Sequence, residues 1–263
     1  MGRPSGRSPW IVAVSAVVAC ACVATASPPA PATDTLNIRG RPQTLHLYGR
    51  RGADPIVVSS SDGGWVRLGP HVAELLASRG NFVVGLDSKA YLESFTSGRD
   101  GVRLEQEPGD FAALVEYARR GSQGRPVLVG VSEGAGLSVL AATDATVKQN
   151  IAGVIGIGLP DVTELAWRWR DSIIYLTHGV PDEPTFSTAA IVDRVAPVPL
   201  VVIHASHDEF VPLQDITRIL EHARDPKQLR VVEASNHRFV DALPSFDAQM
   251  IDAVAWARQH ASR

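Results

Sequence analysis

The sequence predicts an α/β domain with a mostly parallel central sheet and helices on both faces. Two observations predict it. From Leu36 onwards, short strands that are apolar throughout alternate with helix-length amphipathic segments, and such strands are typical of a parallel sheet covered on both sides. In addition, the chain has 263 residues and is 45% hydrophobic, which is enough for one domain with a large buried core.

The first half of the domain begins with an expected hairpin. Its two short strands flank Gly40-Arg41-Pro42, which is typical of a turn. The next strand is wholly apolar and therefore buried, and the helix after it stops at Gly80, a common terminator. We expect strands at Leu36–Arg39, Thr44–Tyr48, Ile56–Val58 and Asn81–Leu86, and helices at His71–Ser78 and Asp110–Arg120.

The second half continues the alternation and contains one interruption. The segment 161–195 holds four aromatic residues and two prolines. It is either a lid over a site or one ordinary crossover helix with a long loop, since long loops are often functional but not always. We expect strands at Val127–Val131, Ile151–Leu159, Pro199–His204 and Leu229–Glu233, and helices from Ala135 to about Ala142, at Leu213–Ala223 and at Phe246–Gln259.

The N-terminal segment 1–26 predicts export. Arg3 and Arg7 precede the uncharged apolar run Trp10–Ala24, and Ala24-Thr25-Ala26 is a cleavage site of the A-x-A type. We therefore expect a signal peptide, a Pro/Ala linker at 27–34, a folded domain at 35–263 and a periplasmic location. Two alternatives stay open: an uncleaved anchor, and lipidation at Cys20, because Val17-Val18-Ala19-Cys20 resembles a lipobox.

Composition excludes several classes of partner. The formal net charge is −3, from 25 Lys+Arg against 28 Asp+Glu, and no basic face is evident, so we expect no nucleic acid partner. Both cysteines fall in the signal segment, so the folded domain forms no internal disulfide. No motif for a cofactor or a metal is present, and none is expected. The sequence does not determine the oligomeric state.

A nucleophile motif carries the chemistry. Gly130-Val131-Ser132-Glu133-Gly134 fits G-x-S-x-G at the junction of an apolar strand and a helix. A sharp turn there holds a serine in strained geometry at the tip of the sheet, and small flanking residues let the strand and helix close. We therefore predict Ser132 as a catalytic nucleophile.

A base and an acid follow Ser132 in chain order. His237 comes after the last expected strand, and Asp208 comes after the strand before it. Ligands meet the carboxyl ends of parallel strands, so these residues should converge with Ser132. We predict His237 as the base and Asp208 as the acid that orients it. Asp161, and less favourably Glu209, are alternative acids.

The transition state also requires oxyanion donors. The N–H of Glu133, directly after the nucleophile, is the first candidate. The second should come from the loop Ser60-Ser61-Asp62-Gly63-Gly64, with Asp62 the better candidate and Ser61 one step away. This loop is alternatively a simple connecting turn. A metal cluster of His204, His207 and Asp208 is disfavoured because no second ligand motif accompanies it.

These motifs together resemble the bacterial virulence protein family VirJ/AcvB. The resemblance covers nearly all of the mature domain, and Asp62-Gly63-Gly64-Trp65 and Asn236-His237-Arg238-Phe239 are its most specific parts. It implies a periplasmic α/β-hydrolase, and some members cleave the aminoacyl ester of aminoacylated phosphatidylglycerol. Carried over, Ser132, Asp208 and His237 would form a Ser-His-Asp triad.

The resemblance has departures that weaken the transfer of a substrate. Where this chain has Ser61, Val131 and Gly136, the family usually has Gly, an aromatic residue and an acidic residue, respectively. We expect a lipid or small-molecule ester as substrate, with a membrane surface as its source. The side chains of Asp62 and Glu133 could receive the ammonium of an esterified amino acid. The expected substrate-binding residues are Asp62, Gly63, Gly64, Trp65 and Glu133.

Two other functions stay open at this point. One is a general carboxylesterase or lipase with the same chemistry. The other is a non-catalytic periplasmic accessory factor for protein export or virulence, which an intact set of Ser132, Asp208 and His237 disfavours.

Overall fold

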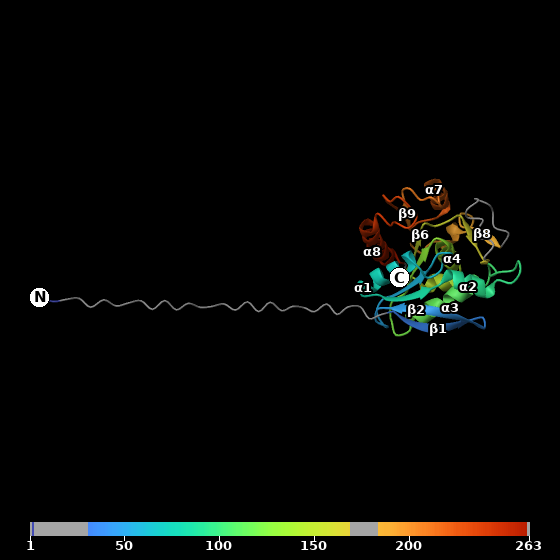
Figure 1. The fold of residues 1–263 in the computed structure, drawn as a ribbon, viewed down its shortest axis with the longest axis horizontal. Coiled ribbons are helices and arrows are strands. Elements are labelled where there is room, and N and C mark those ends of the chain that lie inside the picture. Colours follow the sequence, from blue (N-terminus) through green and yellow to red (C-terminus); the bar gives the residue numbers. More distant parts are fainter. Residues whose placement is uncertain (1, 3–30, 169–183, 262–263) are drawn as a thin grey trace.

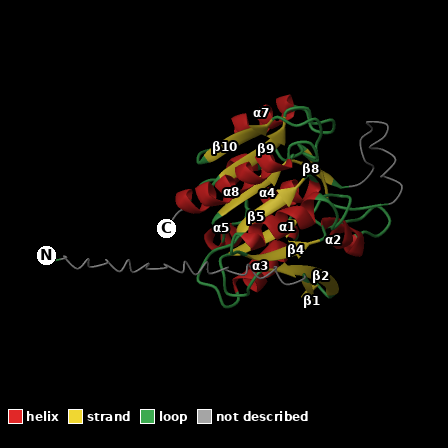
Figure 2. Ribbon diagram, turned by 60° about the vertical axis from the view of Figure 1, so that its left-hand side comes forward, coloured by secondary structure: helices red, strands yellow, loops and turns green. Residues whose placement is uncertain are grey.

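The chain folds around one eight-stranded sheet, in the order β1-β2-β4-β3-β5-β6-β9-β10, with helices on both faces (Figures 1 and 2). This confirms the predicted fold class. The computed structural model describes residues 2, 31–168 and 184–261, so the expected signal segment lies outside the described residues apart from Gly2. The strands of the sheet are β1 (Ala32–Ile38), β2 (Arg41–Tyr48), β3 (Pro55–Ser59), β4 (Phe82–Leu86), β5 (Val127–Val131), β6 (Gly153–Ile157), β9 (Leu200–Ala205) and β10 (Lys227–Val232).

The N-terminal hairpin is the antiparallel end of an otherwise parallel sheet. Its turn is Arg39-Gly40, where both residues have positive φ (48° and 82°), the geometry that matches strand twist in two-residue hairpins. The expected turn at Gly40–Pro42 is therefore wrong by one residue. Pro42 lies in β2, which pairs with β4 only from Leu45 onwards, so its missing N–H interrupts no ladder on that side. β1 begins at Ala32, inside the segment expected to be a linker.

Helices cover the two faces of the sheet with separate cores. Alternate residues of a strand point to opposite faces, so Val57 lies in one core while Ile56 and Val58 lie in the other. α1 and α8 cover the second face, and α3, α4 and α7 cover the first. No helix in the described ranges is long and apolar enough to span a bilayer. The helices are α1 (Leu68–Ser78), α2 (Ser88–Phe95), α3 (Glu107–Arg119), α4 (Glu133–Ala141), α5 (Ala145–Asn150), α7 (Leu213–His222) and α8 (Leu243–His260), with the 3-10 helix η2 (Val192–Val195).

Two short helices, α2 and α5, were not expected from the sequence. Each starts at an aspartate that caps it: Asp87 accepts from the N–H of Ala90, and Asp144 accepts from the N–H of Thr146 and Val147. An N-cap of this kind satisfies amide groups that have no partner inside the helix. The two aspartates are thus sequence signals that could have predicted the starts of these helices.

The segment 161–195 contributes a small second sheet. β7 (Val162–Glu164) pairs antiparallel with β8 (Thr185–Ser187), and η2 follows. The expected lid and the alternative crossover helix both centre on residues 169–183, which lie outside the described residues.

Candidate active site

Ser132 occupies a strained turn between β5 and α4. Its φ of 50° and ψ of −115° lie where a residue with a side chain is rarely found. The flanking glycines make the turn sterically feasible. A Cβ at Gly130 would lie 2.1 Å from the Gly134 carbonyl oxygen, and a Cβ at Gly134 would lie 2.4 Å from the Ser60 carbonyl oxygen. This is the closure of strand and helix for which the motif predicts small residues.

His237 and Asp208 are in direct contact. The Nδ1 of His237 lies 2.6 Å from Oδ2 of Asp208, and because an ionised carboxylate can only accept, the imidazole donates. The other oxygen, Oδ1, accepts from the N–H of Phe210 (2.9 Å) and of Val211 (2.8 Å). The Asp208 side chain is 1% exposed and that of His237 is 10% exposed. The bond fixes the ring and engages Nδ1, so that Nε2 is the ring nitrogen that remains available to another partner.

The ends of β5 and β6 bring Ser132 and His237 to the same place. The N–H of Ser132 donates to the carbonyl of Ile157 at 2.8 Å. The His237 ring packs on the next residue, since a Cβ at Gly158 would lie 2.3 Å from its Cε1. Gly158 has a φ of 56°, and its missing side chain makes room for the imidazole. The serine and the histidine therefore lie against two consecutive residues.

The two alternative acids have other partners. Asp161 accepts from Ser187 Oγ (2.8 Å) and the Ala189 N–H (2.9 Å), and it pairs with Arg218 at 2.9 Å. Glu209 accepts from the backbone N–H of His237 at 2.7 Å. Asp208 is thus the acid that contacts the imidazole among these three, and Glu209 anchors the loop that carries it.

Hydrogen bonds keep the buried Asp208 ionised. Burial raises the pKa of this carboxyl. The hydrogen bond and charge of His237, together with the N–H groups of Val211 and Phe210, lower this pKa by more, so that it lies below the ordinary value. A carboxylate that accepts several hydrogen bonds favours its charged form. Asp208 therefore carries a negative charge beside the imidazole at neutral pH.

A second histidine, His204 on β9, lies behind this carboxylate. It is fully buried, and its Nδ1 is 3.8 Å from Asp208 Oδ2. Neither ring nitrogen has a hydrogen-bond partner within the described part of the chain. Burial lowers the pKa of His204, while Asp208 opposes this effect. Over the described ranges, no three His, Cys, Asp or Glu side chains are grouped as a metal site would require.

The loop after β3 lies beside the turn at Ser132, and hydrogen bonds hold Ser60 of this loop in place. The N–H of Ser60 donates to the Leu86 carbonyl, and its Oγ accepts from the N–H of Ser88, both at 3.0 Å. Ser60 is therefore tied to β4, which leaves Ser61 and Asp62 as candidate oxyanion donors. The N–H of Glu133 lies in the first turn of α4, where amides have no acceptor within the helix. The oxyanion hole stays a prediction.

Two predicted substrate residues make structural contacts. The Trp65 indole stacks on His46 with ring centroids 4.7 Å apart, and its Nε1 donates to Tyr48 Oη at 3.2 Å. A Cβ at Gly85 would lie 2.1 Å from this indole, so Trp65 packs on β2 and β4. Gly64 is buried, and the position of its missing Cβ faces the Asp87 carboxylate at 3.2 Å. Direct contact of Trp65 or Gly64 with a substrate stays a prediction.

The carboxylate of Glu133 is turned toward β7. Its side chain is buried and accepts a hydrogen bond from the backbone N–H of Glu164. Asp62 and Gly63, by contrast, are accessible in the loop after β3. Of the two carboxylates expected to receive an ammonium, Asp62 is the more accessible.

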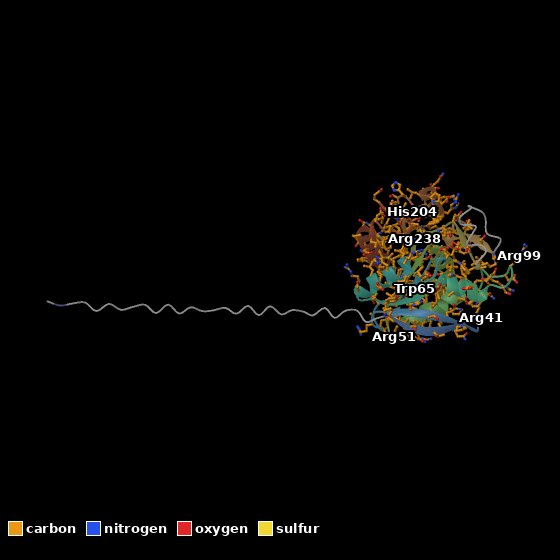
Figure 3. All side chains as sticks on the ribbon, in the orientation of Figure 1. Arg41, Arg51, Trp65, Arg99, His204 and Arg238 are labelled. Carbon is orange, nitrogen blue, oxygen red and sulfur yellow. The ribbon has the colours of Figure 1, made fainter. Side chains whose placement is uncertain are left out.

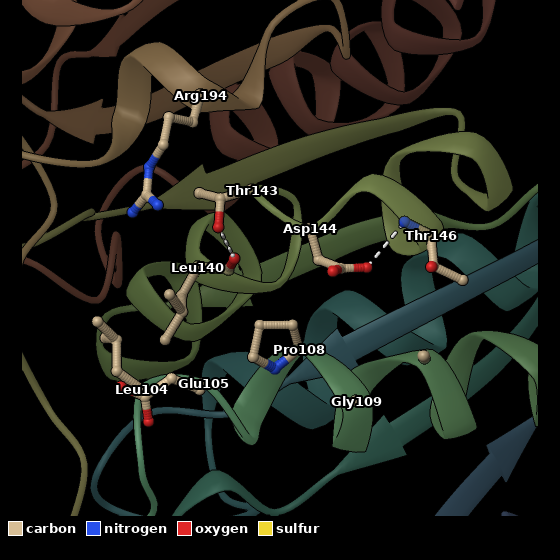
Figure 4. Close-up of a pocket in the computed structure, with 10 residues that line it drawn as sticks. Leu104, Glu105, Pro108, Gly109, Leu140, Thr143, Asp144, Thr146 and Arg194 are labelled. Carbon is tan, nitrogen blue, oxygen red and sulfur yellow. Dashed lines mark hydrogen bonds between the residues drawn. The ribbon is translucent and has the colours of Figure 1, made fainter.

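A cavity of about 530 Å³ lies on the face of the sheet that α3 and α4 cover (Figure 4). Leu140 lines it near the far end of α4, roughly 12 Å from Ser132 at a rise of about 1.5 Å per residue, and Thr143 lines it just after this helix. None of the predicted site residues lines it. Its walls are Leu104, Glu105, Pro108, Gly109, Ala112, Leu140, Thr143, Asp144, Thr146 and Arg194.

Comparison of the sequence with protein families gives one match. The model of the family described as bacterial virulence protein (VirJ) matches residues 54–207, which is more than half of the chain. The chain belongs to the VirJ family. The match includes the loop after β3 and the turn at Ser132, and it ends one residue before Asp208. The expected resemblance is confirmed. No curated protein sequence matches the chain.

Solved structures with the same fold are α/β-hydrolases. The chain is similar to the α/β-hydrolase GrgF from Penicillium sp. sh18, with a TM-score of 0.65 and 12% identity over 88% of this chain and 99% of that one. Est1E from Butyrivibrio proteoclasticus gives a TM-score of 0.61 and 15% identity over 85% and 99%. XC6422 from Xanthomonas campestris, a serine hydrolase without a lid, gives a TM-score of 0.57 and 19% identity over 87% and 95%. The chain therefore has the α/β-hydrolase fold.

Proposed function

We propose that this VirJ-family chain is a serine hydrolase of carboxylic esters. The observation that carries the proposal is the meeting of three strand ends. Ser132 in its strained turn and the His237 ring lie against the consecutive residues Ile157 and Gly158, and Asp208 holds the ring through its Nδ1. A pure binding protein has no need to hold these three groups in one cluster.

The arrangement supports acyl transfer through a serine. Ser132 Oγ attacks the ester carbonyl while His237 Nε2 takes its proton, and the same proton then goes to the departing alcohol. Water next attacks the acyl-serine, with His237 again acting as base, and releases the acid and Ser132. Asp208 keeps its charge throughout and stabilises the imidazolium. The N–H of Glu133 and that of Asp62 or Ser61 would hold the oxyanion.

We further propose that the ester is the aminoacyl ester of aminoacylated phosphatidylglycerol, reached from the periplasmic side. Membership of the VirJ family supports this choice, and the predicted export segment supports the location. The esterified amino acid has a free ammonium, which needs an acceptor near the scissile bond. Asp62 fits this role because its loop borders the turn at Ser132 and its side chain is accessible.

The chemistry is tested by labelling with a fluorophosphonate probe. The wild-type protein should be labelled and should hydrolyse a short nitrophenyl ester, whereas Ser132→Ala should lose both. Ser78→Ala is the matched control, because Ser78 only donates to the carbonyl of Leu75 at the end of α1. A wild-type protein that takes up no label and cleaves no ester would leave the accessory-factor alternative, as would an unchanged cellular phenotype in Ser132→Ala.

The substrate is tested separately with lipid extracts. Release of the amino acid from aminoacylated phosphatidylglycerol supports the proposal. Hydrolysis of the nitrophenyl ester without any action on the lipid favours a general carboxylesterase. Asp62→Asn should lower kcat/KM on a cationic aminoacyl ester about tenfold more than on a neutral ester, because one charge-assisted contact is worth roughly 1.5 kcal/mol. Glu133→Gln is the comparison. Equal losses on both esters in both variants would remove the ammonium role.

A further inference from the structure

The exposed apolar side chains of the molecule gather at one edge. Among the described residues, seven large apolar side chains are exposed, and five of them lie in segments that follow the carboxyl ends of β3, β6, β9 and β10. These strands are parallel, so their carboxyl ends meet at one edge of the sheet, which also carries Ser132. The five are Val66, Val162, Phe210, Leu213 and Val240, with exposed fractions from 40% to 63%.

These residues flank the nucleophile on both sides. The strand order places β5, which ends at Ser132, between β3 on one side and β6, β9 and β10 on the other. The apolar side chains therefore extend over four strand spacings, about 19 Å. The other two exposed apolar residues, Leu229 and Val231, lie on β10 at the side of the sheet. The concentration of five of the seven exposed apolar side chains at this edge is the observation that favours an interaction site there.

Two unpaired arginines lie beside the apolar residues. Arg67 directly follows Val66, and Arg238 lies between His237 and Val240; both are exposed. In the part of the chain that the structure describes, neither guanidinium has a hydrogen-bond or ion-pair partner. Arg238, labelled in Figure 3, lies in the loop that follows β10.

Two acidic groups of the loops after β9 and β10 bind backbone amides, whereas Asp62, in the loop that carries Arg67, is accessible. Glu209 accepts from the backbone N–H of His237, and both oxygens of Asp241 accept from the N–H of Ser235. The two arginines are therefore cations of these loops that have no partner among the described residues and are available to an anionic partner. The chain as a whole has a net charge of −3, so attraction to an anion depends on where these two side chains lie.

We propose that this edge docks on a bilayer that contains anionic phospholipid. The docking edge is defined by Val66, Arg67, Leu213, Arg238 and Val240. The apolar side chains enter the boundary of the acyl chains, while the guanidinium groups bind lipid phosphates at the surface. The inference rests on the proposed function, because a lipid ester reaches Ser132 only if the edge that carries the serine faces the bilayer.

The docking edge is tested by sedimentation with vesicles. The Ser132→Ala protein is used throughout, so that no lipid is consumed. It should bind vesicles of phosphatidylcholine and phosphatidylglycerol, bind phosphatidylcholine alone at least tenfold more weakly, and be released by salt. Arg67→Gln/Arg238→Gln should weaken binding about 30-fold, since each basic side chain near an anionic surface contributes roughly a fivefold factor. The matched control is Arg50→Gln/Arg79→Gln, two exposed arginines at the opposite edge.

The apolar contribution is tested in the same assay. Leu213→Asp/Val240→Asp should weaken binding tenfold or more, because two apolar side chains can no longer be buried. Leu229→Asp/Val231→Asp on β10 is the control and should bind as before. Thermal unfolding midpoints close to that of the parent show that each variant is folded.

Several results would overturn the docking edge. The first is equal vesicle binding by Arg67→Gln/Arg238→Gln and by Arg50→Gln/Arg79→Gln. The second is no binding to either kind of vesicle, and the third is binding to an acidic protein without binding to vesicles. The proposed function fails by a different observation, namely a wild-type protein that neither takes up the fluorophosphonate label nor cleaves a water-soluble ester. The two failures are therefore distinguishable.

Discussion

Two buried carboxyl groups, Asp208 and Glu107, show how surroundings rather than burial decide charge. Both side chains are almost wholly excluded from solvent. Asp208 accepts hydrogen bonds from His237, Phe210 and Val211, and its pKa lies below the ordinary value. Neither oxygen of Glu107 has a hydrogen-bond partner among the described residues. Burial, and then the charge of Asp110, raise its pKa well above the ordinary value.

The neighbour of Glu107 shows what makes the difference. Asp110, on the same helix, is also buried, but Arg39 binds both of its oxygens at 2.7 to 3.1 Å and Tyr91 donates to it at 2.6 Å. Desolvation disfavours every buried carboxylate, and only donors that converge on it offset that cost. A buried charge is thus found where donors converge, which at Asp208 are the His237 ring and the nearby N–H groups of Phe210 and Val211.

The largest effect is expected when the charge of Asp208 is removed. Asp208→Asn should lower kcat on a soluble ester about 10³- to 10⁴-fold, because an amide does not hold the imidazole in the tautomer that accepts a proton from serine. Asp161→Asn is the control, since Asp161 pairs with Arg218 rather than the imidazole. Comparable losses in the two variants would contradict the assignment of the acid.

The next effect concerns the donor to Asp110. Arg39→Met should lower the free energy of unfolding by about 3 kcal/mol, because removing one partner leaves a buried carboxylate without its cation. Urea unfolding measures it. Arg41→Met, at an exposed residue of β2, should change stability by no more than about 0.5 kcal/mol.

Glu107→Met should stabilise the protein. A variant that is no more stable than the wild type would contradict the comparison of Glu107 with Asp208. The folded-state pKa of Glu107 is raised above its ordinary value of 4.5. Its favourable contribution is therefore present below that pH and is lost as the pH rises toward the folded pKa. The variant should gain roughly 1–2 kcal/mol at pH 8 and less at pH 4, since it no longer buries an unpaired polar group. Urea unfolding at both pH values, with the exposed Glu105→Met as control, measures this gain.

The smallest effect is expected at His204. The negative charge of Asp208 favours a proton on the nearer nitrogen, Nδ1, so that a neutral His204 stabilises the carboxylate. His204→Phe should lower kcat/KM roughly three- to tenfold, since one weak polar contact is worth about 1 kcal/mol. His222→Phe, at an exposed site at the end of α7, should leave kcat/KM unchanged. Equal kcat/KM values for His204→Phe and the wild type would contradict this role of His204.

Much of the site was predictable because its signals are local. The turn at Ser132 follows from steric constraints within five residues, as the close approach of Gly130 and Gly134 demonstrates. The apolar strands predicted the sheet, and the order of Ser132, Asp208 and His237 along it followed from counting strand ends. The helices α2 and α5 were missed although Asp87 and Asp144 cap them, because a single aspartate is a weak signal beside apolar periodicity.

The sequence by itself determined the fold class, the turn at Ser132 and the strand ends at which the candidate site residues lie, because each depends on neighbours in the chain. Only the tertiary structure decided that Asp208 rather than Asp161 contacts His237, that Glu133 turns its carboxylate to β7, and that His204 lies behind the acid. The physical reason is that a carboxylate is oriented by its donors. The donors that decide these orientations, the imidazole of His237 at Asp208 and the N–H of Glu164 at Glu133, lie 29 and 31 residues away in the chain, and the fold brings them together.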